Sequence, residues 1–242
     1  MGFVAGTLVH TDKGLVPIEQ LKVGDMVLSK HESGEGEQAY KSIRNAFRSE
    51  NVPILQMSYY DAANPMHELK AQLLYITAGH LVWILQDENE NTINDWIKVE
   101  DVIGGAKVIF ANGTIVEVGY ITEVWATNHQ DIGFAYDCMD ELEIVINVHD
   151  NKIQAYYIGE NAYIIDSSQP DKWTTTDFSD EIIVPSDNHE VKQRFQEFLS
   201  YGHCLISRDA RFTATVYNLE LADYNNYFVG KSGILVAAQK TP

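Results

Sequence analysis

The 242-residue sequence has few cysteines, few basic residues and no long apolar run. Its two cysteines, Cys138 and Cys204, do not form the C-x-x-C pairs that structural zinc sites use. Isolated cysteines in strand-like surroundings usually behave as small buried hydrophobic residues. A disulfide between these two is the alternative. No stretch approaches the roughly 20 apolar residues of a membrane span, and the N-terminus lacks the basic and apolar regions of a signal peptide. The cellular location stays open, because the chain reads like a piece of a longer protein.

Basic residues are scarce relative to acidic ones. The sequence holds 17 Lys and Arg against 35 Asp and Glu, a formal net charge of -18. Such an acidic surface repels phosphate backbones and anionic lipids, which argues against nucleic-acid and membrane partners. Hydrophobic residues make up 45% and charged residues 21%, a composition typical of a folded globular protein rather than a disordered one.

Short apolar runs separated by turn signals dominate the first half of the chain. The turn signals include Asp12-Lys13-Gly14 and Asn112-Gly113, the second of which is a strong hairpin signal. Many short strands with glycine-containing turns predict a mainly β fold. We expect strands at residues 7–11, 15–18, 23–29, 54–60, 73–77, 81–85, 107–110 and 115–124, and again between 214 and 236.

The composition changes from about residue 128 to residue 208. Residues 127–208 contain 15 Asp or Glu and only 5 Lys or Arg. Strand-like runs continue at 143–148, 153–158, 162–165 and 182–184, and a helix is predicted at 191–199 from its N-cap signals and its apolar spacing. We therefore predict an acidic α+β insertion in a β domain, with boundaries 1–127, 128–208, 209–238 and a C-terminal stub at 239–242.

Several separated motifs occur in one order along the chain. They are Phe3-Val4-Ala5-Gly6-Thr7, the stretch 17–29, Thr77-Ala78-Gly79-His80, and the stretches 216–221, 226–230 and 233–236. Together they resemble the Hint domain of inteins, Hedgehog autoprocessing domains, bacterial intein-like domains and pretoxin modules. The resemblance covers roughly residues 2–126 and 212–238, and it implies a horseshoe-like β fold. It also implies that both ends meet on one face, since both scissile bonds must reach one catalytic cluster.

The resemblance assigns roles at the N-terminal junction. In the family, a Cys directly before Phe-x-x-Gly-Thr attacks the preceding carbonyl and converts an amide into a thioester. This position is Gly2, so the thiol is missing. Thr77 is expected to hold the scissile amide, and His80 to protonate its departing nitrogen with a pKa near 6.5. A purely structural role of His80 as a buried polar residue is the alternative.

The resemblance also assigns the C-terminal junction. The family ends its last strand with His-Asn, and the Asn side chain attacks its own carbonyl to form a succinimide. The corresponding positions are Ala237 and Ala238. Asn218 stands where the family often has Asp, and Asn225 where a His is frequent; turn or strand-end roles are the alternative for both. The next residue, Gln239, is not a nucleophile, which favours cleavage over splicing.

The expected function is single-turnover, autocatalytic cleavage in cis that releases a C-terminal passenger such as a toxin. The substrate would be the flanking polypeptide of a monomer, without metal or cofactor. The residues Gly2, Ala237 and Ala238 are those expected of a precursor inactivated on purpose, and natural loss of the reacting groups is the alternative. One alternative is a non-catalytic interaction module whose insertion binds a basic partner. Another is a splicing intein with an eroded endonuclease, which the acidic charge disfavours because such an insertion must contact DNA.

Overall fold

The computed structural model describes residues 1–31, 36–60, 72–126, 132–137, 142–147, 153–158, 161–166, 173–177 and 210–239. The chain divides into two compact units. The first comprises Met1–Ile121 and Thr213–Pro242, and the second comprises Thr122–Phe212. The predicted helix at 191–199 and the predicted strand at 182–184 lie outside the described residues, and the insertion boundaries at 128 and 208 stay predictions.

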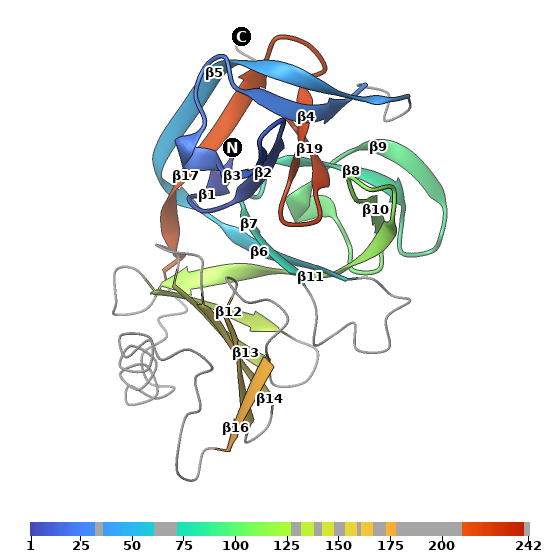
Figure 1. Cartoon of the computed structure of the whole chain (residues 1–242). Helices are drawn as coiled ribbons and strands as arrows, with labels where there is room; N and C mark the ends of the chain where they lie inside the picture. The colour runs from blue at the N-terminus through green and yellow to red at the C-terminus, as the bar shows by residue number, and fades with distance from the viewer. Residues whose placement is uncertain are drawn as a thin grey trace. The chain divides into compact units, whose positions relative to one another are not determined.

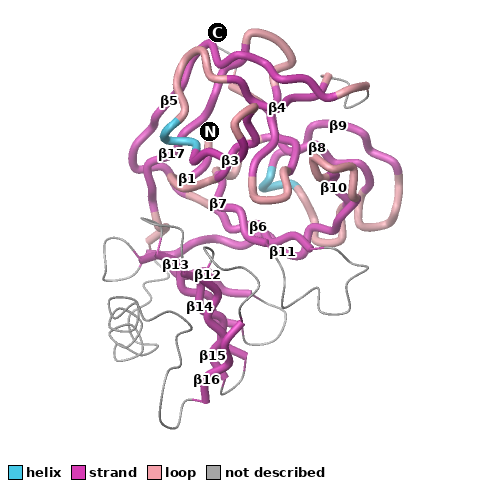
Figure 2. Tube along the Cα trace, viewed as in Figure 1, coloured by secondary structure: helices cyan, strands magenta, loops and turns pink. Residues whose placement is uncertain are grey.

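β-Strands make up most of the described part of the first unit (Figures 1 and 2). Among the residues that the structure describes, the helical turns are the 3-10 helices η1 (Ile18–Gln20) and η3 (Val99–Asp101). The mainly β fold is thereby confirmed. The strands are β1 (Phe3–Val4), β2 (Leu8–Thr11), β3 (Gly14–Pro17), β4 (Met26–Lys30), β5 (Gln38–Pro53), β6 (Leu55–Tyr60), β7 (Gln72–Ile76), β8 (Leu81–Gln86), β9 (Thr92–Lys98), β10 (Lys107–Ile109), β11 (Ile115–Ala126, whose end belongs to the second unit), β17 (Thr213–Leu221), β18 (Asn226–Val229) and β19 (Ile234–Ala237).

The two-residue strand β1 connects distant parts of the first unit. It pairs antiparallel with β17 through Phe3 and Tyr217, and with β7 through Phe3 and Ile76. Strand β17 also pairs along most of its length with β5, and Figure 1 shows β17 (orange) beside β5 and β1 (blue). The hairpin β18–β19 pairs with β8 through Val236 and Val82. The start and the end of the first unit therefore meet at β17, β7 and β8.

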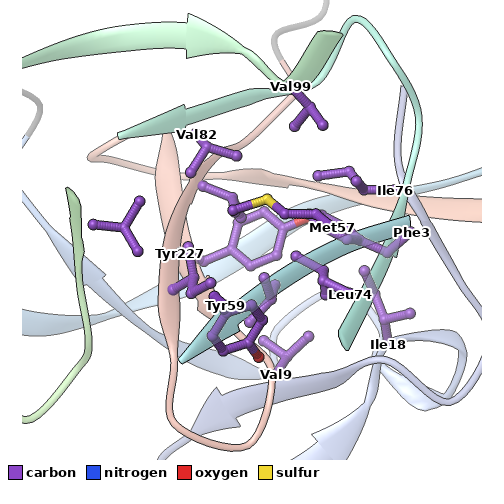
Figure 3. Close-up of a cluster of buried hydrophobic side chains, with 14 of the residues drawn as sticks. Phe3, Val9, Ile18, Met57, Tyr59, Leu74, Ile76, Val82, Val99 and Tyr227 are labelled. Atoms are coloured by element: carbon purple, nitrogen blue, oxygen red, sulfur yellow. The ribbon is translucent and has the colours of Figure 1, made fainter. Parts of the chain in front are cut away.

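Strands β8, β18 and β19 are buried on both faces. Successive side chains of a strand point to opposite sides, and here the two sides enter two separate clusters. Residues Val82, Tyr227 and Val236 belong to the large central cluster, and Figure 3 shows Val82 and Tyr227 within it. Their sequence neighbours form the smaller cluster of Trp83, Phe228 and Leu235. This double burial explains why these strands read as continuous apolar runs rather than as alternating ones.

The second unit contains an antiparallel meander. It begins with the end of β11, where Val124 is paired with Ala135, and each later strand pairs with the one before it. Three of these strands, β13, β14 and β15, fall where the sequence predicts strands, whereas β12 and β16 were not predicted. The strands are β12 (Ile132–Asp137), β13 (Leu142–Asn147), β14 (Ile153–Ile158), β15 (Asn161–Asp166) and β16 (Trp173–Asp177).

Candidate functional site

Two hydrogen bonds hold the N-terminal junction. The backbone N–H of Gly2 donates to Thr77 Oγ1 at 2.9 Å, and the backbone N–H of Thr77 donates to the Gly2 carbonyl at 3.0 Å. Both residues are buried. The side chain of Thr77 therefore contacts the nitrogen of the Met1–Gly2 peptide bond.

The carbonyl of the same peptide bond faces Asn218. Its Nδ2 donates to the Met1 carbonyl oxygen at 3.4 Å, while its Oδ1 accepts from the Leu219 N–H at 2.8 Å and from the Tyr227 hydroxyl at 2.7 Å. Asn218 is buried in the strand next to β1. The Met1–Gly2 bond thus has an acceptor at its N–H and a donor at its C=O, an arrangement that polarises the amide.

His80 closes a turn directly after Thr77. Its backbone N–H donates to the Thr77 carbonyl at 3.0 Å, and its ring packs edge-on against Phe3 with 4.5 Å between the ring centroids. The side chain is 1% exposed, and neither ring nitrogen forms a hydrogen bond. The site therefore contains a fully desolvated imidazole beside the junction.

Burial, together with the nearby N-terminal ammonium, lowers the pKa of His80 to about 3. The backbone of Ala237 acts in the opposite direction, although its contact with the ring does not meet hydrogen-bond geometry. The sequence-based expectation of a pKa near 6.5 is therefore wrong for this structure. Desolvation disfavours the charged imidazolium, so the imidazole is neutral near pH 7.

The C-terminal junction is anchored by backbone hydrogen bonds. The N–H of Ala238 donates to the Asn225 carbonyl at 2.8 Å, and the N–H of Gln239 donates to the Leu219 carbonyl at 2.8 Å. Ala237 lies opposite Asn226 at the end of the β18–β19 hairpin. The structure therefore places all seven residues assigned from the sequence around the two ends: Gly2, Thr77, His80, Asn218, Asn225, Ala237 and Ala238.

Two groups at this site were not assigned from the sequence. The role of the Leu219 carbonyl could not be seen in the sequence. Every residue has a backbone carbonyl, and only the strand register decides which of them faces the Gln239 N–H. Tyr227 has a weak signal: it is an aromatic residue with a polar tip next to the apolar residues Phe228 and Val229 of β18, and buried Tyr hydroxyls usually find a partner. Its partner is Asn218, nine residues earlier.

Gly2 leaves no room for a side chain. A Cβ at this position would lie 2.3 Å from the Tyr217 carbonyl oxygen and 2.8 Å from its carbon. Both atoms belong to the backbone of the neighbouring strand, so relief requires β1 and β17 to separate. A cysteine at position 2 would meet the same obstacle, and the present spacing of the two strands is specific to glycine.

We expect Gly2→Ala to lower the free energy of unfolding by about 1–3 kcal/mol, the usual cost of forcing extra volume into a packed site. Urea denaturation measures this cost. Gly79→Ala is the matched control, because a Cβ there would first meet Met1 Sδ at 3.9 Å, an ordinary contact. An unchanged denaturation midpoint in Gly2→Ala would contradict the prediction and would mean that the strands separate without cost.

Two further features concern ligands and membranes. Within the described residues, no group of three or more His, Cys, Asp or Glu side chains is arranged to hold a metal ion. In the same part of the chain, no helix has the length and apolar character needed to span a bilayer.

No protein-family model matches the sequence, and no curated protein matches it. Among solved structures, a bacterial intein-like domain from Clostridium thermocellum is similar to this chain, with 15% sequence identity and a TM-score of 0.49. The alignment covers 98% of this chain and 97% of that one. A DnaB intein from Synechocystis sp. is similar at 8% identity and a TM-score of 0.47, over 99% of this chain and 100% of that one.

Proposed function

We propose that the chain is the scaffold of a Hint-type self-processing domain whose substrates are the peptide bonds at its own two ends. The observation that supports this most is the position of both bonds on adjacent residues of β17. Asn218 contacts the carbonyl of the Met1–Gly2 bond, and Leu219 accepts the N–H of the Ala238–Gln239 bond. A domain that cuts itself at both ends needs this convergence, because positioning supplies a large part of such catalysis.

At the N-terminal bond, the proposed roles follow from the contacts. Asn218 polarises the carbonyl that a nucleophile at position 2 would attack, and Thr77 orients the amide nitrogen that would leave. The proton that the nucleophile loses would pass to the departing nitrogen, and His80, as a neutral imidazole with a free nitrogen, would be the group that accepts this proton and passes it on. Gly2 supplies no nucleophile, so this chain retains the positioning groups without the reacting one.

At the C-terminal bond, the proposed reaction needs an Asn at position 238. Its side-chain nitrogen would form a bond to its own backbone carbonyl carbon, the bond to the Gln239 nitrogen would break, and the proton lost from the side-chain nitrogen would pass to the leaving amine. The products are a C-terminal succinimide and a passenger that begins at Gln239. Ala238 has no side-chain nitrogen, so the chain stays uncut.

The test restores the C-terminal groups. We expect the Ala237→His/Ala238→Asn double variant to release the peptide that begins at Gln239 during incubation near neutral pH, as a loss of mass in intact-protein mass spectrometry. The single variant Ala237→His is the matched control, because it has the same residue at position 237 but no nitrogen nucleophile at position 238. A double variant that stays full length would refute the proposed C-terminal reaction and leave a non-catalytic interaction module as the better description.

The proposal favours release of a passenger over splicing. Splicing requires a hydroxyl or thiol after the cleaved bond to accept the N-terminal segment, and the Gln239 side chain is an amide. The proposed passenger is a toxin, and the double variant tests whether Ala237 and Ala238 keep the precursor uncut.

A further inference from the structure

The orientation of the Asn218 side chain is determined by its partners. The backbone N–H of Leu219 is a donor only, so the atom that it contacts at 2.8 Å must be the amide oxygen. The amide nitrogen then points to the Met1 carbonyl. With the amide reversed, two donors would face each other and the carbonyl would face an acceptor, which is unfavourable at both ends.

The Tyr227 hydroxyl completes this arrangement. It donates to the same Asn218 Oδ1 at 2.7 Å, the shortest of the three contacts, from within the core. Tyr227 is 0% exposed, and its ring packs edge-on against Phe3 with 6.2 Å between centroids. Burial raises the pKa of the Tyr227 phenol above its ordinary value, so the hydroxyl keeps its proton. Both lone pairs of Oδ1 are then occupied, and the amide cannot rotate without breaking two buried hydrogen bonds.

We propose that Tyr227 is a positioning residue for the N-terminal junction: its hydroxyl holds the Asn218 amide so that Nδ2–H points at the Met1 carbonyl oxygen. The proposal rests on the proposed function in one respect, namely that this carbonyl is the reacting one. Tyr227 contacts neither the carbonyl nor the amide nitrogen in the described contacts, so it acts through Asn218.

The Tyr227 hydroxyl contacts the Asn218 amide, which contacts the Met1 carbonyl, and this relay has a physical consequence. Hydrogen bonds in a chain polarise one another, by about 10–30% per bond, so donation to Oδ1 makes Nδ2–H a stronger donor. The Nδ2 contact is long at 3.4 Å. A contact that is weak to the resting carbonyl and tightens when that oxygen becomes an anion accelerates attack, because it favours the transition state over the ground state.

The test uses a feature of the sequence. Met1–Gly2 is the one Met-Gly dipeptide in the chain. Methionine labelled with ¹³C at the carbonyl and glycine labelled with ¹⁵N therefore yield a single peak in an HNCO spectrum, which reports the Met1 carbonyl. A short N-terminal extension without Met-Gly retains residue 1, since an initiator methionine before glycine is normally removed in cells.

We expect Asn218→Ala to move the carbonyl ¹³C resonance upfield, because a donor to the oxygen is lost. Tyr227→Phe should move it in the same direction by a smaller amount, while keeping the aromatic ring and its ring-current shift. A fluorinated tyrosine at position 227, with a more acidic hydroxyl, should move it downfield. Tyr59→Phe is the matched control and should leave the peak in place, because Tyr59 is equally buried but its hydroxyl faces Gln72 at 3.4 Å.

The outcomes separate this inference from the proposed function. A peak that moves in Asn218→Ala but in neither Tyr227 variant would overturn the role of Tyr227 and leave the proposed function untouched. A peak that stays in place in Asn218→Ala would overturn the whole relay. Because the fluorinated variant keeps the shape of tyrosine, it tests the role of Tyr227 even if Tyr227→Phe fails to fold. Failure of the proposed function appears elsewhere, in the absence of mass loss from the Ala237→His/Ala238→Asn variant.

Discussion

Lowering the pH from 7 to 4 is expected to reduce the free energy of unfolding by about 3 kcal/mol through His80 alone, since a tenfold change in a proton-binding constant corresponds to about 1.4 kcal/mol. Burial lowers the pKa of His80 to about 3 from an ordinary value of 6.5. Between these two values the unfolded chain binds a proton that the folded chain does not. Stability is therefore complete above about pH 6.5, falls as the pH drops toward 3, and changes no further below that through this residue.

Urea denaturation at several pH values between 7.5 and 4, followed by tryptophan fluorescence, measures this slope. Trp83 and Trp96 contact each other in the same unit as His80, with 5.1 Å between ring centroids, and report on its unfolding. We expect His80→Gln to lose most of the slope. Other groups contribute in the same direction, such as His10, whose pKa is also lowered by burial. The parent chain, measured at the same pH values, is the reference. Equal slopes for His80→Gln and the parent chain would contradict the prediction.

Phe3→Ala is expected to cost about 3–5 kcal/mol of unfolding free energy, the usual range for removing a fully buried Phe. Phe3 is 0% exposed, and its ring packs against both His80 and Tyr227. Strand β1 has only two residues, so this side chain supplies much of what holds it between β17 and β7. The substitution should also free the Gly2 N–H, and hydrogen exchange of that amide should accelerate.

Met57→Leu is the control for Phe3→Ala, because it conserves volume in the same cluster and should cost less than about 1.5 kcal/mol. Denaturation midpoints and amide exchange are measured on the same samples. If Gly2 exchanges quickly in Phe3→Ala while the global midpoint stays constant, β1 frays independently and Phe3 is not part of the cooperative core.

Strands of the first unit that the sequence predicts, such as β6 with Met57 and β8 with Val82, bury apolar side chains. Strand β5 was missed for the opposite reason, since Ile43 is the one buried residue among its 16 and its polar residues give no apolar run. Its backbone pairs with β4 and β17 hold it in the sheet. Pairing of this kind arises from tertiary neighbours, which a single sequence does not display.

The candidate site was predictable to the extent that it depends on residue identity and order. Thr77 and His80 could be located from their motif, and the structure brings the Thr77 hydroxyl to the Gly2 N–H and the His80 ring to Phe3. The electrostatics of His80 could not be predicted, because its lowered pKa results from burial beneath Phe3 rather than from any local pattern. Nor could the contact of Tyr227 with Asn218, which depends on the register between separate strands.

Adjacent residues of β17 hold opposite ends of the chain, and this makes the two junctions thermodynamically linked. A displacement of Asn218 on the Met1 side changes the backbone that also positions the Leu219 carbonyl on the Gln239 side. A coupling free energy between two sites is reciprocal. Tightening the contact at one junction would therefore strengthen the contact at the other by the same free energy as the reverse. If the chain cuts itself as proposed, cutting one end would change the affinity of β17 for the other end, and the order of the two cuts would acquire an energetic bias without any moving domain.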